Sequence, residues 1–243
     1  MSTSEPVLKL ENLSRHVVES GKTKPIINNI SFEFERNKIY TILGPSGAGK
    51  SSLLRLINRL DEPTVGRIIV DGKLQCDYFP CELRRMVGYL FQTPHLFPGT
   101  VRDNLLYARD GLTDEQIRDL AVQSHLKSEM INRSADSLSV GEKQRVALAR
   151  LLATEPTIAL LDEPTSALDP AHTADIERLI TELANGSGLT VVMVTHTPEQ
   201  ALRMGGESLL LVSGMLVEHG PCDQVVNHPQ TEPGRMYQRK ELR

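Results

Sequence analysis

The apolar side chains form two kinds of short run, and in the first kind they alternate with polar side chains. Residues 7–10 and 26–34 alternate in this way, which is typical of strands with one buried face, so they predict an antiparallel β layer. Residues 68–70 predict another strand before an Asp-Gly turn. Residues 209–218 predict a hairpin that turns at residues 213–214.

The second kind of run is continuously apolar and rich in β-branched side chains, as in parallel strands that are buried on both faces. These runs are residues 39–43, 87–91, 157–161 and 189–195. Segments with helical periodicity lie between these runs. This agrees with a parallel sheet, which needs helices on its faces. The predicted helices are residues 53–60, 113–126, 170–184 and 198–204, of which the second starts with a capping box at Thr113.

One segment interrupts the alternation of strands and helices. Residues 93–154 carry helical patterns and no strand signal, so we predict an inserted helical subdomain in an α/β chain. Residues 1–243 then form a single domain with a core of residues 1–92 and 155–230. The remaining residues, 231–243, are polar, and we expect them to form a frayed tail.

Composition narrows the class of protein. A net charge of −4 lacks the basic footprint of a nucleic-acid binder, so no nucleic-acid partner is expected. The three cysteines are odd in number and lack zinc-site spacing, which favours a reducing compartment. No signal peptide is visible at residues 1–6, and the longest apolar runs fall short of the ~18 residues that span a membrane. We therefore expect a cytoplasmic chain whose membrane role comes through a partner.

A phosphate-binding loop is predicted between the strand at 39–43 and the helix at 53–60. Residues 44–51 match the pattern G-x-x-x-x-G-K-[ST], in which glycines let backbone N–H groups converge on an anion at a helix N-terminus. Lys50 is expected to reach the β- and γ-phosphates, and the Ser51 hydroxyl to bind Mg²⁺. The predicted nucleotide contacts are Gly44, Pro45, Ser46, Gly47, Ala48, Gly49, Lys50, Ser51 and Ser52.

Three more candidate residues follow buried strands, at positions where parallel sheets bind ligands. Gln92, Asp162 and His196 each stand at a strand end, so the four predicted motifs are expected along one edge of the sheet. A lone glutamine or histidine at such a place is usually a surface or capping residue. Their common edge with the phosphate loop favours a shared site.

The order of these motifs is completed by residues 138–145, Leu-Ser-Val-Gly-Glu-Lys-Gln-Arg. Locally, Ser139 is expected to cap a helix, with Glu142 closing a capping box. Because this stretch precedes Asp162, Glu163 and the Ser-Ala-Leu-Asp sequence that ends at Asp169, the chain resembles the nucleotide-binding subunits of ABC transporters over nearly its whole length. The resemblance implies a P-loop NTPase core of mainly parallel sheet, with an antiparallel β layer and the helical insert.

The resemblance also implies the partners and the composition of the site. Two copies of the chain are expected head to tail, with ATP between the phosphate loop of one and Ser139, Gly141 and Glu142 of the other. Asp169 resembles the aspartate that couples the two sites. An integral membrane permease is the expected second partner, which would hold this subunit on the inner face of the cell membrane.

The resemblance and phosphoryl-transfer chemistry together assign the catalytic roles. Asp162 is expected to hold Mg²⁺ through water, and Glu163 to act as general base or to orient the attacking water. Gln92 resembles the glutamine that contacts Mg²⁺ or water and links the core to the insert. His196 resembles the histidine that contacts the γ-phosphate. With Lys50, these residues form the predicted catalytic set.

Two departures from the family pattern stand out. Val140 occupies a position that usually holds glycine. Because of this valine and of the sequence of residues 91–101, the chain resembles a subgroup that contains bacterial iron-efflux ATPases and a plant aluminium-tolerance ATPase. Phosphate-import ATPases are a more distant match. At the position where the family stacks an aromatic ring on adenine, the chain has Val17, with His16 beside it as the alternative base contact.

Other function classes lack their own signals in this chain. An ABC ATPase that acts on DNA or ribosomes would need coiled-coil arms or a second nucleotide domain with basic linkers, and this chain shows neither. A metabolic P-loop kinase would not carry a sequence like that of residues 138–145. The apolar residues Leu96, Phe97 and Pro98 follow Gln92 in a loop, where they either dock the permease or pack locally under the insert. The sequence leaves the solute and the direction of transport open.

Overall fold

The central sheet joins strands that are far apart in the sequence. In the computed structural model, which describes residues 5–19 and 21–242, its order is β10-β9-β3-β8-β7-β6. Neighbouring strands from β9 to β6 are parallel, and only β10 runs antiparallel to its neighbour in this sheet. The bounds are β3 Ile39–Leu43, β6 Val87–Leu90, β7 Ile158–Asp162, β8 Thr190–Val194, β9 Glu207–Val212 and β10 Met215–Pro221.

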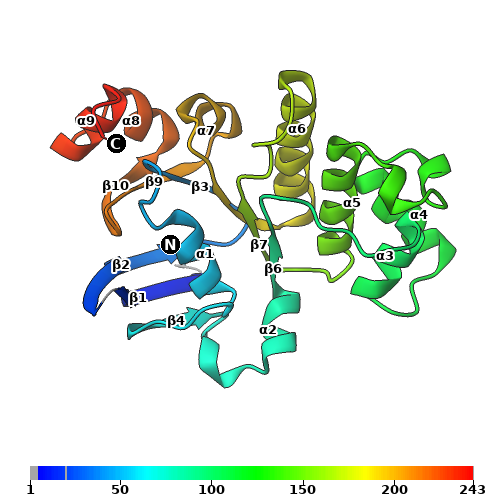
Figure 1. The fold of residues 1–243 in the computed structure, drawn as a ribbon, viewed down its shortest axis with the longest axis horizontal. Helices are drawn as coiled ribbons and strands as arrows, with labels where there is room; N and C mark the ends of the chain where they lie inside the picture. The colour runs from blue at the N-terminus through cyan, green and yellow to red at the C-terminus, as the bar shows by residue number, and fades with distance from the viewer. Residues whose placement is uncertain (1–4, 20, 243) are drawn as a thin grey trace.

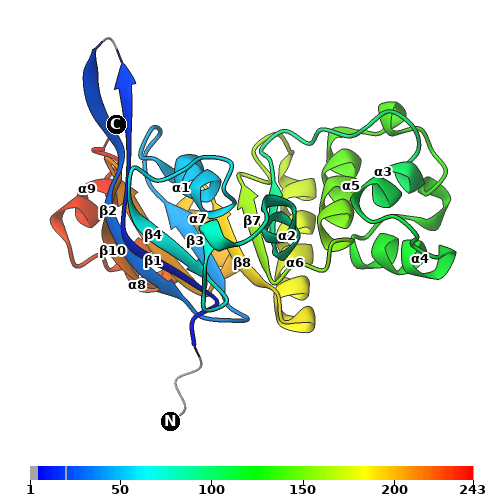
Figure 2. The same cartoon turned by 90° about the horizontal axis from the view of Figure 1, so that it is seen from below.

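The predicted antiparallel layer is confirmed as a second sheet, with the order β2-β1-β4-β5. Its strands are β1 Leu8–Glu19, β2 Lys22–Phe34, β4 Val65–Val70 and β5 Lys73–Leu74. β1 and β2 are longer than the alternation predicted, because pairing continues through register shifts that interrupt the apolar pattern. Their distal parts extend beyond the other strands (Figure 2).

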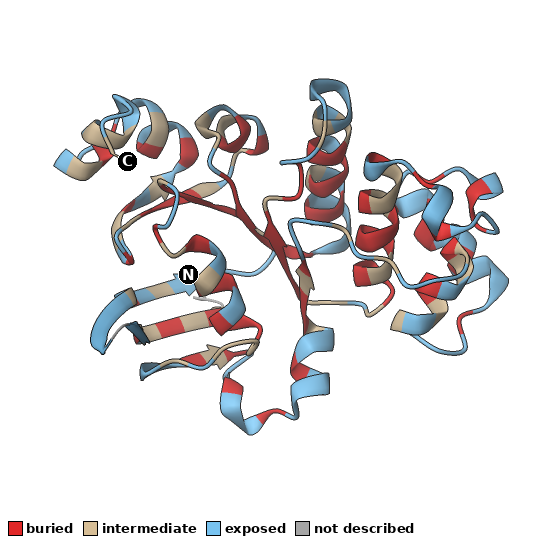
Figure 3. Cartoon of the chain, viewed as in Figure 1, coloured by how far each residue is buried: buried red, intermediate tan, exposed pale blue. Residues whose placement is uncertain are grey.

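The helix α1, Lys50–Ile57, lies between the two sheets (Figure 1). Its apolar residues, among them Leu53 and Leu56, are fully buried with residues of both sheets in one core. α1 ends three residues before the predicted stop, where Asn58 caps it and Arg59 takes a positive φ of 55°. The phosphate loop is thereby fixed between two packed layers, and burial is concentrated in this central region (Figure 3).

The insert contains α3 Val101–Ala108, α4 Asp114–Gln123 and α5 Val140–Leu152, together with 3₁₀ turns at Ser128–Met130 and Ala135–Ser137. It forms one end of the molecule (Figure 1). Each of the three helices starts with a capping box, on Thr100, Thr113 and Ser139 respectively. The capping boxes predicted at Thr113 and Ser139 are confirmed. A second core joins the insert to α6 and one face of the central sheet.

The helix α6 spans Pro170–Ser187 and α7 spans Pro198–Met204, close to the predicted ranges. Three further elements lay outside the predicted helices: a 3₁₀ turn at Gln75–Asp77, α2 at Pro80–Met86 and α8 at Cys222–Asn227. α2 connects the antiparallel sheet to β6. No helix in the described part of the chain is long and apolar enough to cross a membrane.

The prediction of a frayed polar tail was wrong. The helix α9 occupies Glu232–Gln238, with Thr231 as its N-cap. The buried carboxylate of Glu218 accepts hydrogen bonds from the backbone N–H groups of Gln230 and Thr231 and from the Thr231 hydroxyl. Tyr237 packs on a small core that includes Leu43 at the end of β3. These long-range contacts, which a polar composition does not reveal, fold the tail; Arg243 lies outside the described residues.

Candidate nucleotide-binding and catalytic site

The loop between β3 and α1 has a backbone that tolerates no side chain at two of its glycines. Gly44 has a φ of 148°, and a Cβ there would lie 2.1 Å from the carbonyl oxygen of Leu211. Gly49 has a φ of 97°, and its Cβ would lie 2.6 Å from the carbonyl oxygen of Ile26. Both sheets therefore press on the loop, which shapes it as an anion cradle at the N-terminus of α1.

Lys50 is the first residue of α1, and its side chain folds back over the loop. Its Nζ donates hydrogen bonds to the carbonyl oxygens of Gly44, at 2.8 Å, and Pro45, at 2.9 Å. Burial lowers the pKa of Lys50, and the carboxylates of Glu163 and Asp162 partly offset this effect. Among the described residues, the hydrogen-bond partners of this buried ammonium are two carbonyl oxygens, and an incoming triphosphate would supply a direct counter-ion.

Ser51 and Asp162 bring two oxygen ligands together next to Lys50. The Ser51 hydroxyl donates a 2.8 Å hydrogen bond to Oδ1 of Asp162, and the phenol of Tyr89 donates another of 2.8 Å to Oδ2. Burial, and then the charge of Asp162, raise the pKa of Tyr89, so the phenol keeps its proton and remains a donor. Sequence reasoning missed Tyr89, although it lies in a predicted strand, where it pairs with Leu160, two residues before Asp162 on the neighbouring strand β7.

The donor set at this point fits Mg²⁺. A hydroxyl and a carboxylate are the hard oxygen donors that Mg²⁺ prefers, and those of Ser51 and Asp162 lie side by side, 2.8 Å apart. Among the described residues there is no group of three His, Cys, Asp or Glu side chains that would form an all-protein metal site.

Glu163 lies at the centre of the remaining predicted residues. Its Oε2 accepts a 3.1 Å hydrogen bond from Nε2 of Gln92 and lies 3.4 Å from Nδ1 of His196. Gln92 also donates to the hydroxyl of Ser166, at 3.3 Å. The structure thus joins the ends of β6, β7 and β8 through their side chains, as the common sheet edge predicted.

A cavity of about 760 Å³ covers the phosphate loop and this carboxylate cluster. It is lined by Ile26, Ser46, Gly47, Ala48, Gly49, Lys50, Ser51, Ser52, Gln92, Glu163 and His196. Val17 and His16 are not among the lining residues. Ile26 of β2 is, and sequence reasoning missed it because it belongs to another layer of the fold.

The residues of the 138–145 stretch lie elsewhere, at the start of α5. The Ser139 hydroxyl accepts from the N–H of Glu142, and the Glu142 carboxylate accepts from the N–H of Ser139 at 2.8 Å, which lowers the pKa of Glu142. A Cβ on Gly141 would lie 3.2 Å from Cδ2 of His172. Val140 is half exposed, at 49%. Within one chain, none of these residues lines the cavity over the phosphate loop.

Asp169 connects that stretch to α6. Its carboxylate caps α6 by accepting from the N–H groups of Ala171 and His172, and it also bonds Nδ1 of His172 at 2.6 Å. The hydrogen bonds from His172 lower the pKa of Asp169. His172 in turn packs on Gly141, so the Asp169 loop and the start of α5 are in contact.

A comparison with protein families identifies the family to which the chain belongs. A family model described as ABC transporter matches residues 27–166, more than half of the chain. The chain belongs to the ABC transporter family. It is the ATP-binding, ATP-hydrolysing cassette of a transporter, and its P-loop NTPase fold of α/β type agrees with this membership.

Curated relatives of this ABC ATPase come from plants and bacteria. Protein STAR1 of Oryza sativa subsp. japonica is 41% identical over 92% of this chain and 66% of its own length. ABC transporter I family member 17 of Arabidopsis thaliana is 40% identical over 90% of this chain and 83% of its own length. The phosphate import ATP-binding protein PstB of Thermotoga maritima is 38% identical, with coverages of 93% and 94%.

Solved structures share the fold. The ATP-binding cassette MJ0796, a dimer in a post-hydrolysis state bound to ADP and Pi, has a TM-score of 0.78 at 30% identity, covering 88% of this chain and 98% of that one. CbiO1 of Clostridium perfringens, part of the ABC transporter complex cbiONQ, has a TM-score of 0.82 at 26% identity, with coverages of 98% and 100%. Cassettes of this family therefore form dimers and work with membrane subunits.

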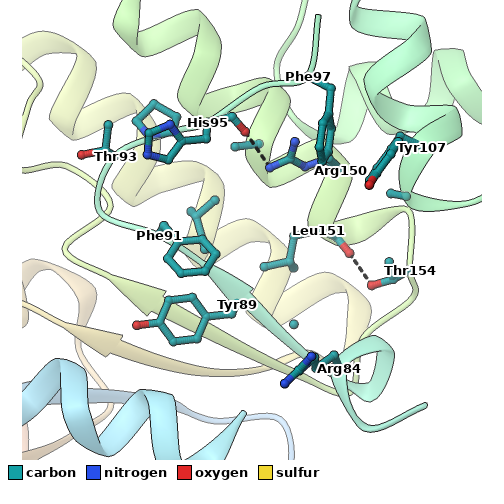
Figure 4. Close-up of a pocket in the computed structure, with 15 residues that line it drawn as sticks. Arg84, Tyr89, Phe91, Thr93, His95, Phe97, Tyr107, Arg150, Leu151 and Thr154 are labelled. Atoms are coloured by element: carbon teal, nitrogen blue, oxygen red, sulfur yellow. Dashed lines mark hydrogen bonds between the residues drawn. The ribbon is translucent and has the colours of Figure 1, made fainter. Parts of the chain in front are cut away.

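The ABC ATPase has a second, smaller cavity of about 290 Å³ where the insert meets β6 (Figure 4). Phe97 stacks on Tyr107 with ring centres 3.7 Å apart, and the guanidinium of Arg150 lies 5.1 Å from the Phe97 ring. Arg150 donates to the carbonyl oxygen of His95 at 2.8 Å, and its Nη1 is buried without a hydrogen-bond partner among the described residues. Burial lowers the pKa of Arg150. Aromatic rings and a buried guanidinium thus line this groove.

Proposed function

We propose that the chain powers the movement of a small solute across the cytoplasmic membrane, by hydrolysing ATP and passing the conformational change to a separate membrane permease. The observation that carries this proposal is the convergence of Lys50, Ser51, Gln92, Glu163 and His196 on one 760 Å³ cavity. A phosphate cradle, a carboxylate base and a histidine at one sheet edge are what ATP hydrolysis requires.

Nucleotide binding in this proposal starts from the phosphate loop. The backbone N–H groups of residues 44–52, apart from Pro45, which has none, cradle the phosphates, and Lys50 exchanges its loop carbonyl partners for phosphate oxygens. Ser51, Asp162 and Gln92 are the residues that would hold Mg²⁺. The ion would neutralise charge that develops on the transferred phosphoryl group.

Hydrolysis falls to the cluster around Glu163. Its carboxylate accepts a proton from the attacking water or orients that water, while Gln92 and His196 hold the carboxylate from two sides. The His196 side chain is 61% exposed and lines the cavity, so it is free to turn toward a γ-phosphate. Its move away from Glu163 would release the carboxylate for the water.

A second copy of the chain completes the site. Ser139, Gly141 and Glu142 lie outside the cavity of their own chain, and their helix N-terminus is suited to phosphate oxygens. We propose that they close over the ATP held by the other copy, as a head-to-tail dimer would allow. Asp169 carries the coupling between the two sites, since its loop contacts the start of α5 through His172. The dimeric MJ0796 cassette is consistent with such an assembly.

The groove beside Gln92 is the proposed docking place of the permease. Phe91, Phe97 and Tyr107 expose 49%, 39% and 69% of their surface at or beside it, which is unusual for aromatic residues without a partner. Gln92 lies between this groove and Glu163, so a permease segment in the groove is one residue away from the catalytic cluster. Docking there would hold the subunit on the inner face of the cytoplasmic membrane.

The solute is proposed to be a metal ion, on the basis of the phrase at residues 91–101 and of Val140, both of which resemble metal-related ATPases. The PstB relatives make inorganic phosphate the alternative. The test is to purify the tagged chain from native membranes, identify the co-purifying integral protein and reconstitute both in liposomes. ATP hydrolysis that rises with metal ions and not with phosphate supports the proposal, and the reverse contradicts the metal assignment.

A further inference from the structure

Glu163 has a backbone conformation that its own residue type does not favour. Its φ is 45°, in the left-handed region that is costly for any residue with a Cβ. Backbone hydrogen bonds hold Glu163 on both sides: its N–H donates to the carbonyl oxygen of Val194 on β8, and its own carbonyl oxygen accepts from the N–H of Ser166. Such a conformation persists only where the surrounding structure fixes it.

A buried polar network fixes the loop two residues after Glu163. Nε2 of Gln200, on α7, donates to the hydroxyl of Thr165 at 2.8 Å and to Oε1 of Glu177, on α6, at 3.0 Å. Thr165, Glu177 and Gln200 expose only 9%, 5% and 3% of their surface. Because a carboxylate only accepts, Glu177 fixes the orientation of the Gln200 amide, and both amide hydrogens are used.

Arg203 closes the network from the solvent side. Its guanidinium donates two 2.7 Å hydrogen bonds to Glu177, one to each carboxylate oxygen, and these bonds raise the pKa of Arg203. Glu177 thereby has three donors and keeps its buried charge compensated. Satisfied networks of this kind fix one arrangement of the elements that they join.

The three elements that meet here are those that carry the proposed catalytic residues. Thr165 follows Glu163, Gln200 lies on the helix that follows His196, and Glu177 lies on the helix that Asp169 caps. We infer that Gln200 is a positioning residue. By bridging Thr165 and Glu177, it holds Glu163 in its left-handed conformation and keeps its carboxylate next to His196. This inference rests on the proposed role of Glu163.

The test compares Gln200→Leu with Gln75→Leu in the full-length chain, at concentrations where ATP drives dimerisation. Gln75 is also buried, at 5%, and its Nε2 donates two hydrogen bonds, but to Leu56 and Ile57 at the end of α1. Both variants should lower the melting temperature. Only Gln200→Leu should slow phosphate release at saturating ATP, by about tenfold or more, with ATP affinity changed by less than about twofold.

Two further variants separate positioning from folding. Thr165→Val removes only the bond between Gln200 and the loop, and it should reproduce the slow phosphate release. Combined with Glu163→Gln, Gln200→Leu should cause no further loss, because the carboxylate that it positions is already gone. Normal phosphate release in Gln200→Leu or Thr165→Val, an equal loss in Gln75→Leu, or additive loss with Glu163→Gln would overturn the inference. Wild-type hydrolysis by Glu163→Gln alone would instead overturn the proposed function.

Discussion

The hydroxyl of Ser51 donates a 2.8 Å hydrogen bond to Oδ1 of Asp162, which joins two residues 111 positions apart. Ser51 belongs to the first turn of α1, and Asp162 is the last residue of β7. The phosphate loop and the carboxylate edge of the sheet are therefore already assembled around a shared pair of oxygens. The second carboxylate oxygen of Asp162 is held by Tyr89.

Tyr89→Phe should weaken Mg²⁺ binding, because it frees the Asp162 carboxylate to rotate while leaving the ring in place. Removing an outer-shell partner typically costs about tenfold or more in metal affinity. The measurement is a titration of Mg²⁺ into the ATP complex of each protein, with ATP affinity in EDTA as the control. A change confined to the EDTA control would mean that Tyr89 acts on the loop instead of on Asp162.

Phe97→Ala should weaken association with the permease more than it weakens ATP binding. The substitution removes the ring that stacks on Tyr107 and that lies next to Arg150, but it leaves the phosphate loop untouched. Co-purification with the permease and titration of a fluorescent ATP analogue measure the two effects. Val122→Ala is the matched control, since Val122 is an exposed apolar residue, at 65%, that does not line the groove. Equal loss of both activities would indicate misfolding of the insert.

Selectivity for the base of the nucleotide is expected to be weak. Val17 lies near the end of β1, opposite Lys24, and neither Val17 nor His16 lines the cavity. Affinities for ATP and GTP should therefore lie within about tenfold of each other. If position 17 lies beside the base, as the family pattern implies, Val17→Tyr should tighten ATP binding by about 1 kcal/mol, or about fivefold. If His16 stacks on the base instead, His16→Ala and not Val17→Ala will reduce affinity. Strong ATP selectivity that survives both alanine changes would refute both ideas.

The capping box of α5 should contribute pH-dependent stability. The hydrogen bond from Ser139 lowers the pKa of Glu142 below its ordinary value of 4.5. A lowered carboxyl pKa stabilises the folded state above that ordinary value, and this stability is lost as the pH falls through the folded pKa. Glu142→Ala should therefore cost about 1 kcal/mol at pH 7, and the difference from wild type should shrink below pH 4.5. Urea unfolding at several pH values measures it; a pH-independent difference would contradict the mechanism.

Local patterns were enough to predict the elements that carry most of the site. The apolar run at residues 39–43 matches β3, and the range 198–204 matches α7 residue for residue. Buried strands and capped helices carry strong local signals, because burial of both faces and satisfaction of the helix ends are decided by neighbouring residues. Because parallel strands end at the same edge of a sheet, these strands also predicted that Gln92, Glu163 and His196 would lie close together.

The parts that the sequence did not predict depend on contacts between distant residues. The tail folds as α9 because the carboxylate of Glu218 accepts hydrogen bonds from the backbone just before the helix. The polar sequence of the tail does not reveal that this carboxylate lies beside it. Tyr89 on β6 bonds Asp162 on the neighbouring strand β7, which lies far away in the sequence, and Ile26 lines the cavity from the antiparallel sheet. The Gln200 network likewise joins three elements that have no shared local pattern.

We propose that two copies of this chain sandwich ATP between the phosphate loop of one and Ser139 of the other. Glu163→Gln should bind ATP but turn over at least about a hundredfold more slowly, because the amide keeps the shape of the carboxylate and loses its basicity. Lys50→Ala should instead lose nucleotide affinity, since the buried ammonium no longer meets the phosphates.

The measurement is the mass of Glu163→Gln in solution with ATP and Mg²⁺, alone and combined with Ser139→Arg. We predict a dimer with two bound ATP molecules for the single variant, and a monomer that still binds ATP for the double variant. A single variant that stays monomeric at saturating ATP, or a dimer that persists with Ser139→Arg, would contradict the ATP-sandwich dimer.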